Sequence, residues 1–147
     1  MEGLEIRIAR DEELPEIITL YNLMWADSKS PLTMKVGENI YRRIRDNPDD
    51  DMYVVLLEDR IVGSFTVLVR KGGGGSNECV VENVAVNPKF QRRGIGSSIV
   101  YFLTDWCKLC GIATLTFTSG EKRDKSDAFY EAMGFERRGF SFTKTID

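Results

Sequence analysis

The chain has 147 residues, with 42% hydrophobic and 29% charged side chains and a net charge of −3, which is typical of a globular domain. This length suits a single domain spanning residues 1–147. No apolar run approaches the ~18 residues that a membrane span needs, and the start lacks the pattern of a signal peptide, so we expect a cytoplasmic protein. A pI near 5.1, without a dense basic stripe, argues against a nucleic-acid partner.

Charge is distributed unevenly along the chain. Residues 1–60 carry 8 Lys and Arg against 14 Asp and Glu, a net charge of −6, whereas residues 89–147 carry 10 against 7, a net charge of +3. The basic second half suits a polyanionic cofactor, and the acidic first half suits an amine. A patchy, solvated surface would give the same pattern, so charge alone leaves both interpretations open.

The three cysteines, Cys79, Cys107 and Cys110, are expected to be reduced structural thiols. Cys107 and Cys110 form a C-x-x-C spacing near the end of a predicted helix, whereas a redox pair belongs at a helix start. The chain has no histidine to complete a zinc site. We therefore predict no metal.

The first predicted elements are a strand and two helices. Hydrophobic alternation predicts a strand over Leu4–Ile8. Asp11 is expected to cap a helix whose apolar face consists of Leu14, Ile17, Ile18, Tyr21 and Met24. A second helix is predicted through Ile40, Tyr41 and Ile44, and Asn47-Pro48 should end it.

Strands follow in the middle of the chain. Met52–Leu57 and Ile61–Arg70 are predicted to form a hairpin that turns at Asp59-Arg60. The glycines of residues 72–75 predict a flexible loop. A further strand is expected over Cys79–Val86.

The last four predicted elements alternate between helix and strand. A helix is expected from Gly94 to Cys110 and a strand over Ile112–Thr118. A short helix over Ser126–Met133 and a final strand over Phe135–Ile146 complete the chain.

Near the centre of the sequence, a predicted strand ends and the glycine-bearing start of a helix follows. Pro88 ends the hydrogen-bonding ladder of the preceding strand, and Gln91-Arg92-Arg93-Gly94-Ile95-Gly96-Ser97 follows directly. Backbone N–H groups at a helix start lack intrahelical partners, and the helix dipole makes that end positive. The segment therefore predicts an anion site, most naturally for a diphosphate.

Other phosphate-binding motifs do not fit this segment. No Walker loop occurs, and the dinucleotide fingerprint fails because Ile99 stands where a third glycine or alanine is needed. The pattern Gln/Arg-x-x-Gly-x-Gly/Ala after an apolar strand resembles the GNAT superfamily of N-acetyltransferases. A second motif of that superfamily is matched by Ala128–Phe135, and the predicted element order is similar over nearly the whole chain.

The resemblance implies a fold and a cofactor. The fold would be a single α/β domain with a mixed, mainly antiparallel twisted sheet flanked by helices, in the order β-α-α-β-β-β-α-β-α-β. The co-substrate would be acetyl-CoA. The residues implied to contact it are Val84, Ala85 and Val86 along the pantetheine arm, Gln91, Arg92, Arg93, Gly94, Ile95, Gly96 and Ser97 at the diphosphate, and Arg123.

Two of these positions depart from the commonest pattern of the superfamily. Arg123 stands where many members have an asparagine, which leaves that cofactor contact open. Gln91 replaces the commoner first arginine, so Arg92 and Arg93 supply the positive charge.

The resemblance also implies catalytic residues. Tyr130 matches the tyrosine that commonly acts as general acid toward the departing thiolate, and the alternative is a core aromatic. Glu82 is the candidate base, because the attacking nitrogen must lose a proton and the chain has no histidine. It could instead be an exposed residue of its strand. Asn83 is the neighbouring candidate for a substrate contact.

The acceptor is expected against the first two helices. Their acidic residues favour a cationic small molecule; these are Glu12, Glu13, Glu16, Asp27 and Glu38. A protein or peptide acceptor and a non-catalytic acyl-CoA sensor are the alternatives, and a homodimer stays open.

Overall fold

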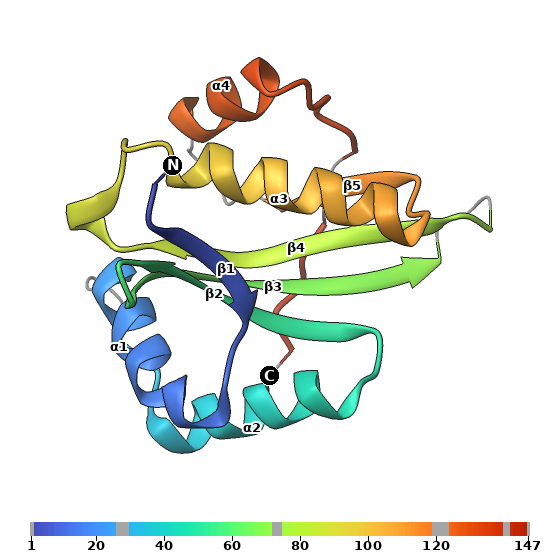
Figure 1. The fold of residues 1–147 in the computed structure, drawn as a ribbon. Helices are drawn as coiled ribbons and strands as arrows, with labels where there is room; N and C mark the ends of the chain where they lie inside the picture. The colour runs from blue at the N-terminus through green and yellow to red at the C-terminus, as the bar shows by residue number, and fades with distance from the viewer. Residues whose placement is uncertain (1, 26–29, 72–74, 119–123, 140–141, 147) are drawn as a thin grey trace.

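The computed structural model describes residues 2–25, 30–71, 75–118, 124–139 and 142–146. These residues contain five strands and four α-helices, arranged as one sheet with helices on its faces (Figure 1). In chain order they are β1 Leu4–Ile8, α1 Leu14–Met24, α2 Met34–Asp46, β2 Asp50–Leu57, β3 Arg60–Lys71, β4 Asn77–Val86, α3 Ile95–Cys110, β5 Thr114–Phe117 and α4 Asp124–Ala132. Short 3₁₀ turns at Asp11–Glu13 and Pro88–Phe90 precede α1 and α3.

The strands form one sheet in the order β1-β2-β3-β4-β5. Neighbouring strands are antiparallel except for β4 and β5, which are parallel. Helices α1 and α2 cover one face of the sheet, and α3 and α4 lie on the other (Figure 1). The sheet is therefore mixed and mainly antiparallel, as the sequence predicts.

Alternation along the strands divides the core between the two faces. Met52, Val54 and Leu56 of β2 pack in a cluster with α1 and α2. Tyr53 and Val55 point the other way, into a cluster with α3. A side-chain period of two residues produces this division, so each face of the sheet needs its own helical cover.

The observed helix boundaries correct one predicted cap. Asp11 does not cap α1, because a 3₁₀ turn precedes the helix and Glu13 is its N-cap residue. The Asp11 carboxylate instead accepts a 2.7 Å hydrogen bond from the Tyr41 hydroxyl. That bond joins the start of α1 to α2. The hairpin turn also shifts by one residue, since Glu58 and Asp59 have the positive φ angles of 49° and 66°.

The predicted final strand, Phe135–Ile146, is not found in the described part of the chain. Residues 135–139 and 142–146 carry no strand pairing. Phe142 and Ile146 are 98% and 81% exposed, so these two apolar side chains bury no common face. Without such a face, a strand lacks its main source of stability.

Two of the three cysteines pack in the core, as expected of structural thiols, whereas Cys110 is exposed. All three are free thiols, and Cys79 and Cys107 are buried between β4 and α3. Burial raises the pKa of the Cys79 thiol to about 12, which keeps it protonated. Among the described helices, none is long and apolar enough to cross a membrane.

Candidate functional site

A bulge in β4 lies at the centre of the candidate site. Ser64 of β3 pairs with Ala85 and Thr66 pairs with Glu82, so one β3 residue faces two residues of β4. Asn83 is one of those two and has a φ of 54°, in the left-handed region. Asparagine tolerates this conformation better than most residues. The bulge reverses which face of the sheet the following side chains occupy.

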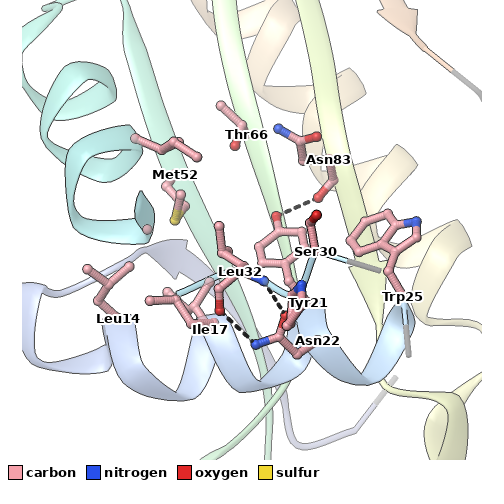
Figure 2. Close-up of a pocket in the computed structure, with 14 residues that line it drawn as sticks. Leu14, Ile17, Tyr21, Asn22, Trp25, Ser30, Leu32, Met52, Thr66 and Asn83 are labelled. Atoms are coloured by element: carbon pink, nitrogen blue, oxygen red, sulfur yellow. Dashed lines mark hydrogen bonds between the residues drawn. The ribbon is translucent and has the colours of Figure 1, made fainter. Parts of the chain in front are cut away.

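The α1 helix is joined directly to this bulge. The Tyr21 hydroxyl donates a 2.6 Å hydrogen bond to the backbone oxygen of Asn83 (Figure 2). Burial raises the pKa of Tyr21 to about 12, so the hydroxyl keeps its proton at neutral pH and remains a donor. Sequence reasoning placed Tyr21 only on the apolar face of its helix and missed this contact.

From the bulge onward, β4 is no longer paired with β5. β5 pairs with β4 only from Glu78 to Val81, and the last contact is a 3.3 Å bond from the Thr118 N–H to the Val81 oxygen. Within the described residues, nothing pairs with that edge of β4 from Glu82 onward. An unpaired strand edge offers donors and acceptors to an extended ligand.

The peptide groups of β4 alternate between its two edges. The Asn87 N–H donates to the Val62 oxygen at 2.8 Å, on the β3 side. Alternation then directs the peptide groups of Val84 and Val86 toward the open edge and those of Ala85 toward β3. The Val86 oxygen accepts a 3.1 Å bond from the Gln91 side chain. Gln91 therefore holds the loop against the strand end.

The N-terminus of α3 lies directly after this loop. Gly94 is its N-cap residue with a φ of 85°, and no side chain caps the helix. The first-turn N–H groups, from Ile95 to Ser97, consequently have no capping acceptor, and the helix dipole adds positive charge there. Arg92 also has a positive φ, of 62°, and the Arg93 guanidinium lies 5.3 Å from the centre of the Phe90 ring. Positive charge and uncapped amides of this kind favour an anion.

Helix α4 packs over the start of α3. A Cβ added at Gly96 would lie 3.4 Å from the Phe129 ring, an ordinary contact distance, so Phe129 packs directly over this position. Tyr130, the predicted acid, is half-buried, and its ring centre lies 5.2 to 5.6 Å from those of Phe117, Phe129 and Phe135. Its ring therefore has a packing role, whatever its hydroxyl does.

Glu82, the predicted base, is half-buried on β4 directly opposite Thr66. Paired residues lie on the same face of a sheet, so the Glu82 side chain is on the face covered by α1 and α2. The charge of Glu82 also contributes to the raised pKa of Arg70, after the hydrogen bond and charge of Asp50. Glu82 lies next to the pocket described below but is not one of its lining residues.

A pocket of about 290 Å³ lies between α1, the segment that joins it to α2, and the sheet (Figure 2). Its lining includes Asn83, the residue that the resemblance suggests for a substrate contact. The other lining residues are Leu14, Ile17, Ile18, Tyr21, Asn22, Trp25, Ser30, Pro31, Leu32, Gly37, Ile40, Met52 and Thr66. The pocket thus occupies the predicted acceptor position and ends at the β4 bulge.

The acidic residues of the first two helices do not reach this pocket. Glu12, Glu16 and Glu38 are exposed and lie outside its lining. Glu13 forms a bidentate ion pair with Arg7, with distances of 2.8 and 2.7 Å. Asp27 and the predicted cofactor contact Arg123 lie outside the described residues. The expectation of an acidic acceptor site is therefore not met in the described lining.

Residues 15–135 match the model of the Acetyltransferase (GNAT) family, and the chain belongs to that family. A ribosomal protein bS18-alanine N-acetyltransferase of Salmonella typhimurium is 36% identical over 59 residues, covering 40% of each chain. The match thus spans less than half the length of that relative. A glucosamine 6-phosphate N-acetyltransferase of Arabidopsis thaliana is 25% identical over 116 residues, covering 73% of each chain.

Solved structures share the fold. An aminoglycoside acetyltransferase from an uncultured soil metagenomic sample has a TM-score of 0.80 at 22% identity, covering 99% of this chain and 97% of the other. A transcriptional regulator from Bacillus halodurans has a TM-score of 0.84 at 21% identity, covering 97% and 99%. At these identities the likeness concerns the fold alone.

Proposed function

We propose that the protein transfers the acetyl group of acetyl-CoA to a primary amine of a small molecule. The observation that carries the proposal is the bulge at Asn83. On one side of it, β4 presents an edge that no described residue pairs with, and this edge leads to the N-terminus of α3, which no side chain caps. On the other side, the pocket beneath α1 ends at the same residue. A cofactor and an acceptor bound at these two places would meet at one strand.

The residues present fit acetyl-CoA. Val84 and Val86 offer peptide groups to an extended arm, and the amides from Ile95 to Ser97 offer donors to a diphosphate. Arg92 and Arg93 add positive charge beside them. Gln91 acts by holding the loop through its bond to Val86. When bound, acetyl-CoA supplies a thioester carbonyl that an uncharged amine can attack.

Two side chains are assigned to the proton transfers. Glu82 accepts the proton of the amine, directly or through water, and it lies on the pocket face of β4. The Tyr130 hydroxyl donates a proton to the leaving thiolate, with its ring fixed by three neighbouring aromatic rings. An attack in a ternary complex requires no covalent enzyme intermediate.

The size of the pocket favours a small acceptor. A volume of about 290 Å³ lies at the lower end of the range for small-molecule sites, roughly 300–1,000 Å³. The curated relatives include one enzyme named for a ribosomal protein and one named for an amino sugar phosphate, so relationship alone does not choose between these classes. A peptide acceptor and a non-catalytic acyl-CoA sensor are the competing functions.

Release of free CoA from acetyl-CoA, measured over a panel of small amines and peptides, tests the proposal. We expect amine-dependent release that Tyr130→Phe lowers about 10- to 10⁴-fold, with little change in acetyl-CoA affinity. Glu82→Gln keeps the shape of the side chain but cannot accept the proton, so it should lower the rate and alter the acid limb of the pH profile. Tyr101→Phe is the matched control, because Tyr101 is 62% exposed on α3.

Three results would contradict parts of this account. Tight acetyl-CoA binding without release to any amine or peptide would favour the sensor. Faster transfer to peptides than to every small amine would favour a protein acceptor. A Tyr130→Phe variant that loses stability but keeps normal turnover would identify Tyr130 as a packing residue alone.

A further inference from the structure

A second pocket lies on the face of the sheet that α3 covers, at the C-terminal end of that helix. Its volume is about 230 Å³, and it has no described lining residue in common with the acceptor pocket. The proposed cofactor site is at the other end of α3, and a helix of 16 residues is about 24 Å long (Figure 1). The second pocket is therefore separate from both parts of the site described above.

Two carboxylates line this second pocket. Asp51 and Tyr53 are two residues apart on β2, so their side chains lie on the same face of the sheet. Asp49 lies in the turn before β2, where its backbone oxygen accepts a 3.2 Å bond from the Val69 N–H. Arg45 pairs with Asp51 at 3.3 Å, but the two side chains are 41% and 34% exposed, and such a pair contributes little. None of the ion pairs among the described residues involves Asp49.

The Tyr53 hydroxyl lacks a partner at the same pocket. The residue is 7% exposed, and its hydroxyl makes no hydrogen bond within the described part of the chain. Its oxygen is not fully enclosed, in contrast to the Thr66 Oγ1 atom, so a molecule in the pocket can reach it. Burial, followed by the charge of Asp51, raises the pKa of Tyr53 to about 12, which keeps the hydroxyl neutral at pH 7. A ligand that donated a hydrogen bond to this oxygen would remove the cost of leaving it unpaired.

Other features of the second pocket also favour a cation. The C-terminal end of a helix carries partial negative charge, and α3 ends at Cys110, which lines the pocket. Trp106 supplies aromatic surface of the kind that cations bind, and aliphatic side chains of β3 adjoin it. Residues 72–74, which connect the lining residues of β3 and β4, are all glycine and add no side-chain charge. The described residues contain no group of three or more His, Cys, Asp or Glu placed to hold a metal ion, so an organic cation fits better.

We propose that the second pocket binds an organic cation with N–H donors, a guanidinium or ammonium group on a short apolar stem. The cationic group lies between the carboxylates of Asp49 and Asp51 and donates to the Tyr53 hydroxyl. The apolar stem covers Trp106 and the aliphatic residues of β3. The inference is independent of the proposed function, since the two pockets share no described residue.

The two tryptophans of the chain report the two pockets separately. Trp25 lines the acceptor pocket, Trp106 lines the second pocket, and the chain has no other tryptophan. Each indole N–H gives its own signal in a proton–nitrogen correlation spectrum, and Trp25→Phe and Trp106→Phe assign the two signals. The probe is butylguanidinium, which stays charged at neutral pH and is therefore not an acceptor for acetyl transfer. Butanol and butyrate are the neutral and anionic comparisons with a stem of the same length.

We expect butylguanidinium to shift the Trp106 signal until it saturates and to leave the Trp25 signal in place. Butanol and butyrate lack the positive charge, so they should bind more weakly than butylguanidinium. Calcium and magnesium ions, titrated in the same way, should not compete with the probe, because the pocket offers too few oxygen ligands among the described residues.

Three variants test the groups that bind the cation. Tyr53→Phe keeps the ring and removes only the hydroxyl, so it should weaken binding of the probe about 2- to 10-fold. Asp49→Asn and Asp51→Asn should each weaken it about 2- to 5-fold. Asp59→Asn makes the same chemical change at an exposed position in the turn at the other end of β2, and it should bind as the parent does. The rest of each spectrum shows whether the variant is folded.

Four results would overturn the inference. The first is a shift of the Trp25 signal alone, which would mean that the cation binds in the acceptor pocket. The second is equal affinity for butanol and butylguanidinium, and the third is parent affinity in both Asp49→Asn and Asp51→Asn. The fourth is displacement of the probe by calcium or magnesium, which would indicate a metal site. None of these results bears on acetyl transfer, which the release of CoA tests separately.

Discussion

Removing the Tyr21 hydroxyl tests the link between α1 and the β4 bulge. In Tyr21→Phe the ring stays in place, but the 2.6 Å bond to the Asn83 oxygen is lost. Tyr21 is 9% exposed, so water does not readily replace the hydroxyl. The lost bond and the carbonyl left without its partner should together lower the free energy of unfolding by about 1–3 kcal/mol.

The pH dependence of the same variant gives an independent check. Burial raises the pKa of Tyr21 from 10.0 to about 12, so the unfolded chain loses this proton at a lower pH than the folded protein does. The stabilisation is fully present below pH 10 and is lost as the pH rises toward 12. Between pH 10 and 12, this difference in the pKa of Tyr21 makes the free energy of unfolding fall by about 1.4 kcal/mol per pH unit. Tyr21→Phe should make the decline shallower by that amount.

Urea unfolding at pH 7 and at a series of pH values up to 12 measures both effects. Tyr101→Phe, at a 62% exposed position, is the control and should match the parent at pH 7. In the transfer assay, Tyr21→Phe should also raise KM for the amine, because Tyr21 lines the acceptor pocket. A Tyr21→Phe variant with the parent's stability at pH 7 and the parent's alkaline decline would refute the reasoning.

Two further predictions concern the packing of α2 against α1 and the ion pair of Arg7 with Glu13. Gly37→Ala would place a Cβ 2.4 Å from the Ile18 Cδ1 atom. This overpacking, partly offset by the higher helix propensity of alanine, should lower the free energy of unfolding by about 1–2 kcal/mol in urea unfolding. The double variant Gly37→Ala with Ile18→Ala should lose less stability than the sum of the two single losses. Arg7, chiefly through its hydrogen bond, lowers the pKa of the Glu13 carboxyl. The stabilisation from this ion pair is present above the ordinary pKa of glutamate and is lost as the pH falls through the lowered pKa of Glu13 in the folded protein. Glu13→Gln should therefore cost about 1 kcal/mol at pH 7 in urea unfolding and nothing in strong acid, and an equal cost at both would contradict the assignment.

The elements that local sequence determines were predictable. Gly94 marks the start of α3 because a glycine, two arginines and a preceding proline are adjacent in the chain, and the structure has Gly94 as the N-cap residue. Gly111 ends the same helix in the left-handed conformation that a C-terminal glycine favours. The sequence located all five strands, Leu4–Ile8 from its alternation and the others from apolar and β-branched runs, with shifts of a few residues at their ends.

The features that depend on contacts between distant segments were not predictable. Nothing in Val81-Glu82-Asn83-Val84 reveals a bulge, because its position depends on how β4 pairs with β3. Thr66 is inconspicuous in its strand, and nothing in its sequence neighbours reveals that its hydroxyl is buried without a hydrogen-bond partner among the described residues. For the same reason, the acidic composition of the first 60 residues said nothing about which side chains face the pocket.

The failure of the last predicted strand has a related cause. Residues 135–146 contain enough apolar residues to suggest a strand, but Phe142 and Ile146 are 98% and 81% exposed and so lack a surface to pack against. Gly139 has a φ of 73°, which interrupts an extended backbone within the segment. Sequence alternation alone does not report whether a segment finds a surface that buries its apolar side chains.

The central claim is that acetyl-CoA binds at the N-terminus of α3, and the two ends of that helix allow a matched test. Gly94 and Gly111 have φ angles of 85° and 69°, and a Cβ added at either would meet nothing within 4 Å. Gly94→Leu and Gly111→Leu therefore carry similar backbone strain, about 1–2 kcal/mol each.

Calorimetric titration of acetyl-CoA into the folded parent and the two variants is the decisive measurement. The account predicts that Gly94→Leu weakens binding by about 1–3 kcal/mol, or roughly 5- to 150-fold, because the side chain obstructs the first-turn amides. Gly111→Leu should bind acetyl-CoA as the parent does. A folded Gly94→Leu protein that keeps the parent's affinity for acetyl-CoA would contradict the account.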